Sequence, residues 1–161
     1  MIRTLRAIIS AIILSSPTMP KEIAHGYAEI VQRESVKAGI DPLDLVALVH
    51  SESRWRAGAT NYMGCQGLTQ ICPQFMNNKA ALLDPATNLR LAAGNIRMNR
   101  EFCKKKVGKS ARLNWLFSLG GYNIPSQNIY CGMKKTKKGW KAVATPASIT
   151  RLLKFRSKLP K

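Results

Sequence analysis

One carboxylate stands out among the residues that could do chemistry. The segment from Asp41 to Ser53 is apolar and predicts a helix, and Glu52 lies at its end, three residues before Trp55. Burial raises the pKa of a carboxyl group, so that it can hold a proton near neutral pH and deliver it to a leaving oxygen. We therefore take Glu52 as a candidate general acid. The alternative is an ordinary exposed Glu at a helix end, where a negative charge opposes the helix dipole.

Acidic residues are scarce and unevenly placed. The 161 residues include 26 Lys and Arg but 8 Asp and Glu, which gives a formal net charge of +18. Residues 103–161 hold 15 of the basic residues and none of the acidic ones. So few acids exclude most multi-carboxylate metal sites, and we predict no metal and no cofactor. The positive charge favours a polyanionic partner such as nucleic acid, an anionic membrane or a cell-wall polymer. No zinc-finger, RNA-recognition or basic-zipper pattern is present, so we predict no specific nucleic acid.

The elements that must position Glu52 are predicted to be helices joined by loops, which indicates a mainly α protein. In the helix that contains Glu52, Asp41 can cap the start and Pro42 suits the first turn. Residues 56–79 are rich in Gly, Asn and Gln and predict a long ordered loop. Other helices are expected from Pro20 to Gly39, from Asp84 onwards, from Ser110 to Leu119 and after Thr145. A basic turn is expected at residues 134–141. In the helix that begins at Asp84, the side chains expected to face inward are Leu89, Ala92, Ala93, Ile96 and Phe102.

The N-terminal segment is typical of an export signal. Arg3 and Arg6 precede an apolar run at residues 7–14 that is too short to span a bilayer as a helix. We therefore predict an exported protein, periplasmic or secreted. The segment has no good cleavage site, which leaves an uncleaved N-terminal membrane tether open. A buried N-terminal helix is the competing interpretation.

The four cysteines are Cys65, Cys72, Cys103 and Cys131. An even number in an exported chain predicts two disulfides, and three pairings are open. We prefer Cys65–Cys72 with Cys103–Cys131, because both bonds would hold loops next to helices. Zinc binding and buried free thiols are the alternatives, but no Cys-x-x-Cys pair is present.

Three ordered motifs resemble the soluble lytic transglycosylase family. Residues 52–55 (Glu-Ser-Arg-Trp), followed by residues 67–71 (Gly-Leu-Thr-Gln-Ile), are similar to the Glu-Ser-x-aromatic segment and the Gly-Leu-Met-Gln segment of that family. Residues 84–89 resemble the start of its second helix, and residues 121–123 (Gly-Tyr-Asn) resemble its Ala-Tyr-Asn-Ala-Gly motif. The short length and the export-like start are most similar to the small members that serve secretion, conjugation or pilus machines.

The resemblance implies a lysozyme-like single domain with a groove for the glycan strands of peptidoglycan. We place this domain at residues 21–130, after a signal-like or tether segment at residues 1–20. A basic extension with a final helix follows at residues 131–161. The basic run at residues 134–141 is expected to bind the anionic cell wall. The alternative is that these side chains form a solvated charged face with no partner.

The implied reaction cleaves the MurNAc-β-1,4-GlcNAc bond without water and forms a 1,6-anhydromuramyl end, with Glu52 as the single general acid and base. A lysozyme-type hydrolase would need a second carboxylate roughly 6.5–9.5 Å from the acid. No acid lies between Glu52 and Asp84, and Asp44 is about 12 Å back along the same helix. The sequence therefore favours the transglycosylase over the hydrolase.

The resemblance also implies four substrate-binding residues, Asn61, Gln70, Tyr122 and Asn123. Gln70 matches a Gln that contacts the sugar amide, and Tyr122 matches a Tyr near the catalytic Glu. Their alternatives are a loop-stabilising amide and a core tyrosine. Asn61 replaces the usual Ser, and residues 124–125 (Ile-Pro) replace Ala-Gly. These departures keep a catalytically weakened wall-binding module as a further alternative.

Overall fold

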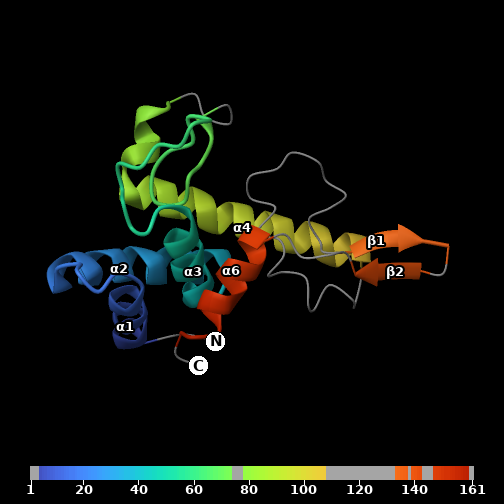
Figure 1. The fold of residues 1–161 in the computed structure, drawn as a ribbon, viewed down its shortest axis with the longest axis horizontal. Coiled ribbons are helices and arrows are strands. Elements are labelled where there is room, and N and C mark those ends of the chain that lie inside the picture. Colours follow the sequence, from blue (N-terminus) through green and yellow to red (C-terminus); the bar gives the residue numbers. More distant parts are fainter. Residues whose placement is uncertain (1–3, 74–77, 108–132, 138, 143–146, 160–161) are drawn as a thin grey trace.

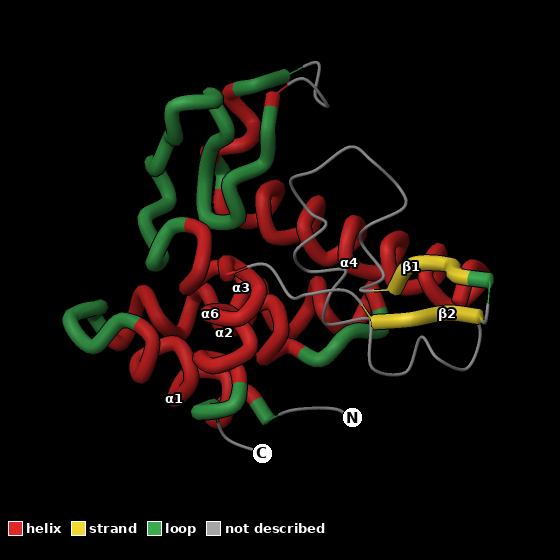
Figure 2. Tube along the Cα trace, turned by 45° about the vertical axis from the view of Figure 1, so that its right-hand side comes forward, coloured by secondary structure: helices red, strands yellow, loops and turns green. Residues whose placement is uncertain are grey.

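The computed structural model describes residues 4–73, 78–107, 133–137, 139–142 and 147–159 (Figure 1). It is mainly helical, as predicted. Figure 2 shows the helices gathered together, with the long loop that follows the third helix standing on one side of them. The elements are α1 (Leu5–Ser15), α2 (Lys21–Ala38), α3 (Pro42–Glu52), the 3₁₀ helix η2 (Ala80–Leu83), α4 (Pro85–Val107), β1 (Met133–Thr136), β2 (Gly139–Ala142) and α6 (Ala147–Arg156).

The ends of α2 and the start of α3 follow the predicted signals. Helix α2 ends at Gly39, which has a φ of 64°, a conformation that glycine adopts without the steric cost of a side chain. Two residues later, the side chain of Asp41 accepts a hydrogen bond from the backbone N of Leu43 (3.0 Å), and Pro42 occupies the first turn of α3. The short connection between the helices is therefore fixed at both ends.

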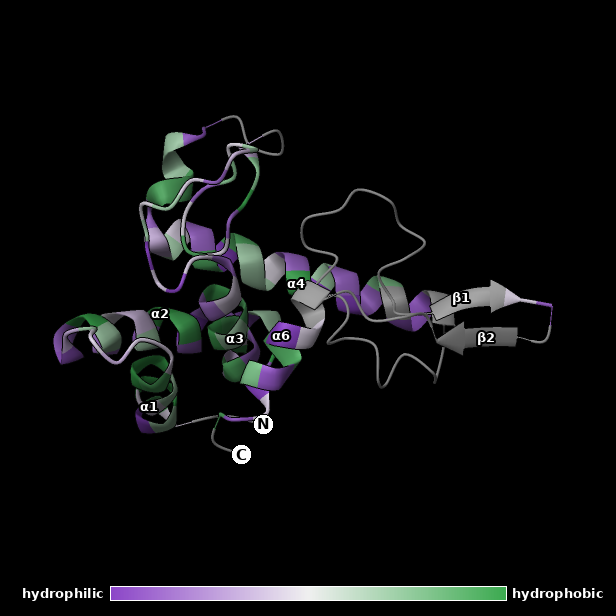
Figure 3. Ribbon diagram, in the orientation of Figure 1, coloured by the Kyte–Doolittle hydropathy of each residue, from purple (hydrophilic) through white to green (hydrophobic). Residues whose placement is uncertain are grey.

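Helix α3 is the central element of the fold. All of its residues from Pro42 to Val49 are buried, and α1, α2, α4 and α6 contact it. Figure 3 shows α3 largely in the colour of hydrophobic residues, whereas hydrophilic and hydrophobic bands alternate along α4. Because these helices surround α3, the position of its last residue, Glu52, is fixed.

The N-terminal segment forms helix α1, which packs against α2 and α3. Ile8, Ala11 and Ile12 have no exposed surface and belong to the hydrophobic core. The segment therefore forms a buried helix, as the competing interpretation expected. Its role in export stays a prediction. Among the described helices, none combines the length and the apolar character needed to cross a membrane.

Helix α6 belongs to the same core, although the sequence analysis placed it in an extension. Leu152 and Leu159 are buried in the core cluster. Arg156 donates from Nε to Asp44 Oδ1 (2.7 Å) and from Nη2 to Asp41 Oδ2 (2.9 Å). The Asp44 side chain has no exposed surface. Ion pairs therefore join α6 to the start of α3.

Helix α4 begins as predicted, since Asp84 Oδ2 accepts a hydrogen bond from the backbone N of Thr87 (2.7 Å). The expectation that Phe102 points inward is wrong, because the C-terminal part of α4 continues past α2 and α3 and leaves Phe102 exposed (Figure 1). The inward positions that are confirmed as buried are Leu89, Ala92, Ala93 and Ile96.

The basic run is a hairpin instead of the expected turn. Strands β1 and β2 pair antiparallel, with Lys134 opposite Lys141 and Lys135 opposite Trp140. Thr136 and Trp140 are residues of types that favour strands. The helix predicted at residues 110–119 lies outside the described residues.

Candidate active site

Glu52 is the last residue of α3, and its side chain is partly buried. The chain turns sharply directly after it. The backbone N atoms of Ser53 and Arg54 both donate to the carbonyl of Val49 (3.0 Å each), and Arg54 and Trp55 have positive φ values of 52° and 67°. A positive φ is costly for residues with side chains and persists where the surrounding structure enforces it. The backbone around Glu52 is therefore held in one strained turn.

Trp55 anchors this turn in the core. Its side chain is buried, and its Nε1 donates to Ser15 Oγ at the end of α1 (2.5 Å). Its ring lies 5.4 Å from the ring of Tyr27 in α2. The turn that follows Glu52 is thus fastened to both α1 and α2.

His50 lies two residues before Glu52 and connects three helices. Its Nδ1 donates to the carbonyl of Ser15 (3.1 Å), and its ring stacks on Phe155 of α6 at a centroid distance of 3.8 Å. Burial lowers the pKa of His50 and the nearby Arg54 charge lowers it further, whereas the hydrogen bond to Ser15 raises it; the net shift is downward.

This lowered pKa predicts a loss of stability in mild acid. The folded protein binds fewer protons at His50 than the unfolded chain, whose His pKa is about 6.5. The contribution to the free energy of unfolding is therefore present above about pH 6.5 and is lost as the pH falls from there through the pKa of the folded state. In urea titrations over this range, His50→Gln should show a flatter dependence on pH than the wild type.

The matched control is His25→Gln, which makes the same chemical change at an exposed position of α2. Asp84, whose pKa is lowered by hydrogen bonds from Thr87, should add its own loss of stability only below about pH 4. An unchanged slope in His50→Gln would show that the ring does not titrate with folding.

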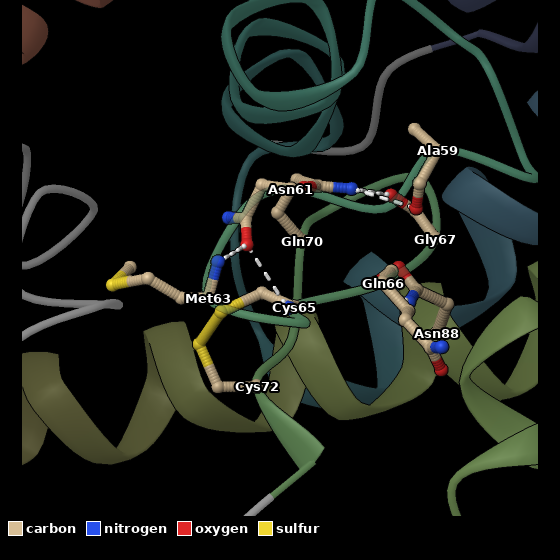
Figure 4. The surroundings of a disulfide bond; sticks show 9 residues. All are labelled: Ala59, Asn61, Met63, Cys65, Gln66, Gly67, Gln70, Cys72 and Asn88. Atoms are coloured by element: carbon tan, nitrogen blue, oxygen red, sulfur yellow. Dashed lines mark hydrogen bonds between the residues drawn. A yellow bond between two sulfur atoms is a disulfide. The ribbon is translucent and has the colours of Figure 1, made fainter.

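The loop after Trp55, described at residues 56–73, is stabilised by isolated β-bridges and by a disulfide (Figure 4). It is called the braced loop. Gln66 makes isolated antiparallel bridges with Thr60 and with Ile71. The predicted bond between Cys65 and Cys72 is confirmed. The predicted partner bond, Cys103–Cys131, involves side chains outside the described part of the structure and stays a prediction.

Loss of this disulfide should destabilise the fold by about 2.5 kcal/mol, the chain-entropy value for the loop of roughly eight residues that it closes. The double variant Cys65→Ala/Cys72→Ala, unfolded in urea under oxidising conditions, measures the loss directly. A midpoint equal to that of the wild type would show that the other loop contacts suffice.

Gly67 and Asn88 fasten the loop to α4. Gly67 has a φ of 78°, and a Cβ added there would collide with the carbonyl of Leu82 and the amide of Asn88. Asn88 is buried, and its Oδ1 accepts from the backbone N (2.8 Å) and Oγ1 (2.6 Å) of Thr69. Its Nδ2 donates to the carbonyls of Gln66 (3.1 Å) and Leu82 (2.8 Å). Sequence reasoning assigned no role to Asn88; its position four residues after a capping Asp was the available signal.

Asn61 and Gln70, two of the predicted substrate-binding residues, hold the loop backbone. Asn61 Oδ1 accepts from the backbone N atoms of Met63 (2.9 Å) and Cys65 (3.0 Å), and in Figure 4 its amide nitrogen points away from these contacts.

Gln70 is buried, and its Nε2 donates to the carbonyls of Ala59 (3.0 Å) and Gly67 (2.9 Å). These contacts fit the loop-stabilising alternative for Gln70. The other two predicted residues, Tyr122 and Asn123, lie outside the described residues.

All eight acids of the chain lie within the described residues, and the structure distributes them widely. Within this part of the chain, no group of three His, Cys, Asp or Glu side chains could hold a metal ion. Apart from Glu52, the acids are found at the following places: Glu22 in the first turn of α2, Glu29 beside His25, Glu34 beside Arg33 and Lys37, Asp41 and Asp44 on Arg156, Asp84 at the start of α4 and Glu101 on Lys104.

Comparison with known proteins shows the family of the chain. No curated protein matches the chain. A family model described as the transglycosylase SLT domain matches residues 29–143, which is more than half of the chain. The match includes α3 with Glu52, the braced loop and α4. The chain therefore belongs to the transglycosylase SLT domain family, whose activity is cleavage of peptidoglycan by lytic transglycosylases.

Proposed function

We propose that the protein is a lytic transglycosylase that cleaves the MurNAc-β-1,4-GlcNAc bond, with Glu52 as its single general acid and base. The observation that supports this most is the distribution of acids. Glu52 ends the buried helix α3 beside a loop braced by a disulfide and by Asn88, while the seven other acids lie at the distinct places given above.

In the proposed reaction, protonated Glu52 gives its proton to the glycosidic oxygen, and the bond between this oxygen and C1 of the muramyl sugar breaks. The acetamido group of the substrate stabilises the developing positive charge at C1, as in other substrate-assisted glycosidases. The Glu52 carboxylate then takes the proton from the 6-hydroxyl, whose oxygen attacks C1. The product is a 1,6-anhydro end, Glu52 is protonated again, and no water is consumed.

The first acid before Glu52 in the sequence and the first acid after it are both engaged elsewhere. Asp44 lies eight residues before Glu52, has no exposed surface and binds Arg156. Asp84 Oδ2 accepts a hydrogen bond from the first turn of α4. An inverting hydrolase would need a carboxylate roughly 6.5–9.5 Å from the acid, with room for water between them. These engagements support the transglycosylase over a lysozyme-type hydrolase.

The products decide between the two reactions. Mass spectrometry of digests of purified peptidoglycan should find 1,6-anhydro ends, each one water lighter than a reducing end. Predominantly reducing ends would instead establish a hydrolase. Binding to cell walls without release of fragments would establish a catalytically weakened wall-binding module.

We also propose that the protein is exported, because its substrate lies outside the cytoplasm and because disulfides such as Cys65–Cys72 persist in oxidising compartments. The basic hairpin is proposed to hold the enzyme on the anionic wall. Service to a secretion, conjugation or pilus machine, and an N-terminal membrane tether, stay predictions.

A further inference from the structure

A pocket of about 340 Å³ lies between α2 and α4. None of the residues that line it belongs to the turn after Glu52 or to the braced loop. From α2 come Glu34, Lys37 and Ala38, and from α4 come Arg90, Ala93, Gly94, Arg97 and Met98. The volume is within the range of about 300–1,000 Å³ that is usual for small-molecule sites.

The charge of this pocket is positive. Its carboxylate, on Glu34, is buried and already engaged on its own helix, since Oε1 accepts from Arg33 Nε (2.7 Å) and lies 3.5 Å from Lys37 Nζ. Arg90 and Arg97 make no ion pair in the described part of the chain; Arg90 only makes a minor contribution to the lowered pKa of Asp84. Two guanidinium groups therefore remain to attract an anion.

Part of the pocket lining is small and apolar. Ala38 and Ala93 are buried, and a Cβ added at Gly94 would meet no atom within 4 Å, so the space above this glycine is open. Arg90 and Arg97 lie seven residues apart, about 10 Å along the axis of α4, with Gly94 between them. The lining of the pocket thus combines small apolar residues with two guanidinium groups.

We propose that this pocket binds the terminal carboxylate of a short apolar peptide. A guanidinium group matches a carboxylate with two parallel hydrogen bonds, and small side chains such as alanine methyl groups can pack against Ala38 and Ala93. That the natural ligand is a peptide stem of peptidoglycan rests on the proposed function. The pocket would then hold the stem of the strand that is being cleaved, or of a neighbouring strand.

The test uses the full chain and N-acetyl-D-Ala-D-Ala as the probe, by calorimetry or ligand-detected NMR at low salt. The peptide should bind, and its C-terminal amide, which lacks the charge, should not. Arg90→Gln and Arg97→Gln should each weaken binding on the order of tenfold, the effect expected for losing a charge-assisted hydrogen bond. Arg151→Gln, at an exposed position of α6, is the matched control and should bind as the wild type does.

A second pair of variants tests the space itself. Gly94→Leu should fill the pocket and abolish binding, and it replaces a mid-helix glycine with a better helix former. Gly26→Leu is its control, because Gly26 is also helical and a Cβ there also meets no atom within 4 Å.

Three results would overturn the proposal: no binding of the peptide, binding unchanged by the pocket variants, or tighter binding of inorganic phosphate than of the peptide. The last would assign the site to phosphate groups. The outcome is separate from that of the proposed reaction, because binding needs no turnover and Glu52→Gln should bind the probe normally.

Discussion

Replacing Glu52 by Gln is expected to lower the release of glycan fragments from peptidoglycan by about 10²–10⁴-fold, the usual contribution of general acid–base catalysis. Gln cannot give a proton to the glycosidic oxygen or take one from the 6-hydroxyl. No other acid of the chain stands at the end of α3, so we expect no substitute to restore the reaction. Fragment release, quantified by chromatography and mass spectrometry, measures the effect.

Glu22→Gln is the matched control, because it makes the same chemical change at an exposed position in the first turn of α2. It should retain wild-type activity. Thermal unfolding should show that Glu52→Gln is folded, so that loss of activity cannot be ascribed to loss of structure. Activity of Glu52→Gln within a few-fold of the wild type would refute the assignment of the acid.

Replacing Arg156 by Ala is expected to cost about 3–5 kcal/mol of unfolding free energy, because it breaks the ion pair between Arg156 and the buried Asp44 carboxylate. Asp41, which caps α3, loses the same partner. Urea unfolding followed by circular dichroism should show a lower midpoint. Because α3 ends in Glu52, activity near the new midpoint should fall with the folded fraction.

The double variant Arg156→Leu/Asp44→Asn separates the charge from the packing. With the buried carboxylate made neutral, much of the lost stability should return, because breaking a buried ion pair is costlier than replacing both partners. Arg151→Ala, on an exposed part of the same helix, should change stability by less than about 0.5 kcal/mol. If Arg156→Ala unfolds like Arg151→Ala, the ion pair does not hold α6.

Local signals predicted the end of α2 and the starts of α3 and α4. Asp41 with Pro42 and Asp84 with Pro85 specify helix starts within one turn of sequence, and Gly39 specifies an end. The disulfide between Cys65 and Cys72 was similarly accessible, since its two cysteines are close in sequence. In each of these cases, the residues that decide the structure are neighbours in the chain.

Contacts between distant residues could not be predicted in this way. Trp55 bonds with a serine 40 positions earlier, and Arg156 bonds with an aspartate 112 positions earlier. Apolar periodicity shows that a helix has a buried face but does not name the partner of that face. For this reason the first and last helices were assigned to a leader and an extension. Asn88 was missed as a loop anchor because its four bonds all lead to other segments.

The ion pair between Arg156 and the first turn of α3 has a consequence for the order in which the protein forms. During synthesis, the segment that carries Glu52 leaves the ribosome more than one hundred residues before its cationic partner. Until then the buried Asp44 carboxylate lacks its ion pair with Arg156, and contacts of such long range are slow to form because of their loop-closure entropy. Helix α3, with Glu52 at its end, therefore reaches its final packing only after Arg156 has been synthesised.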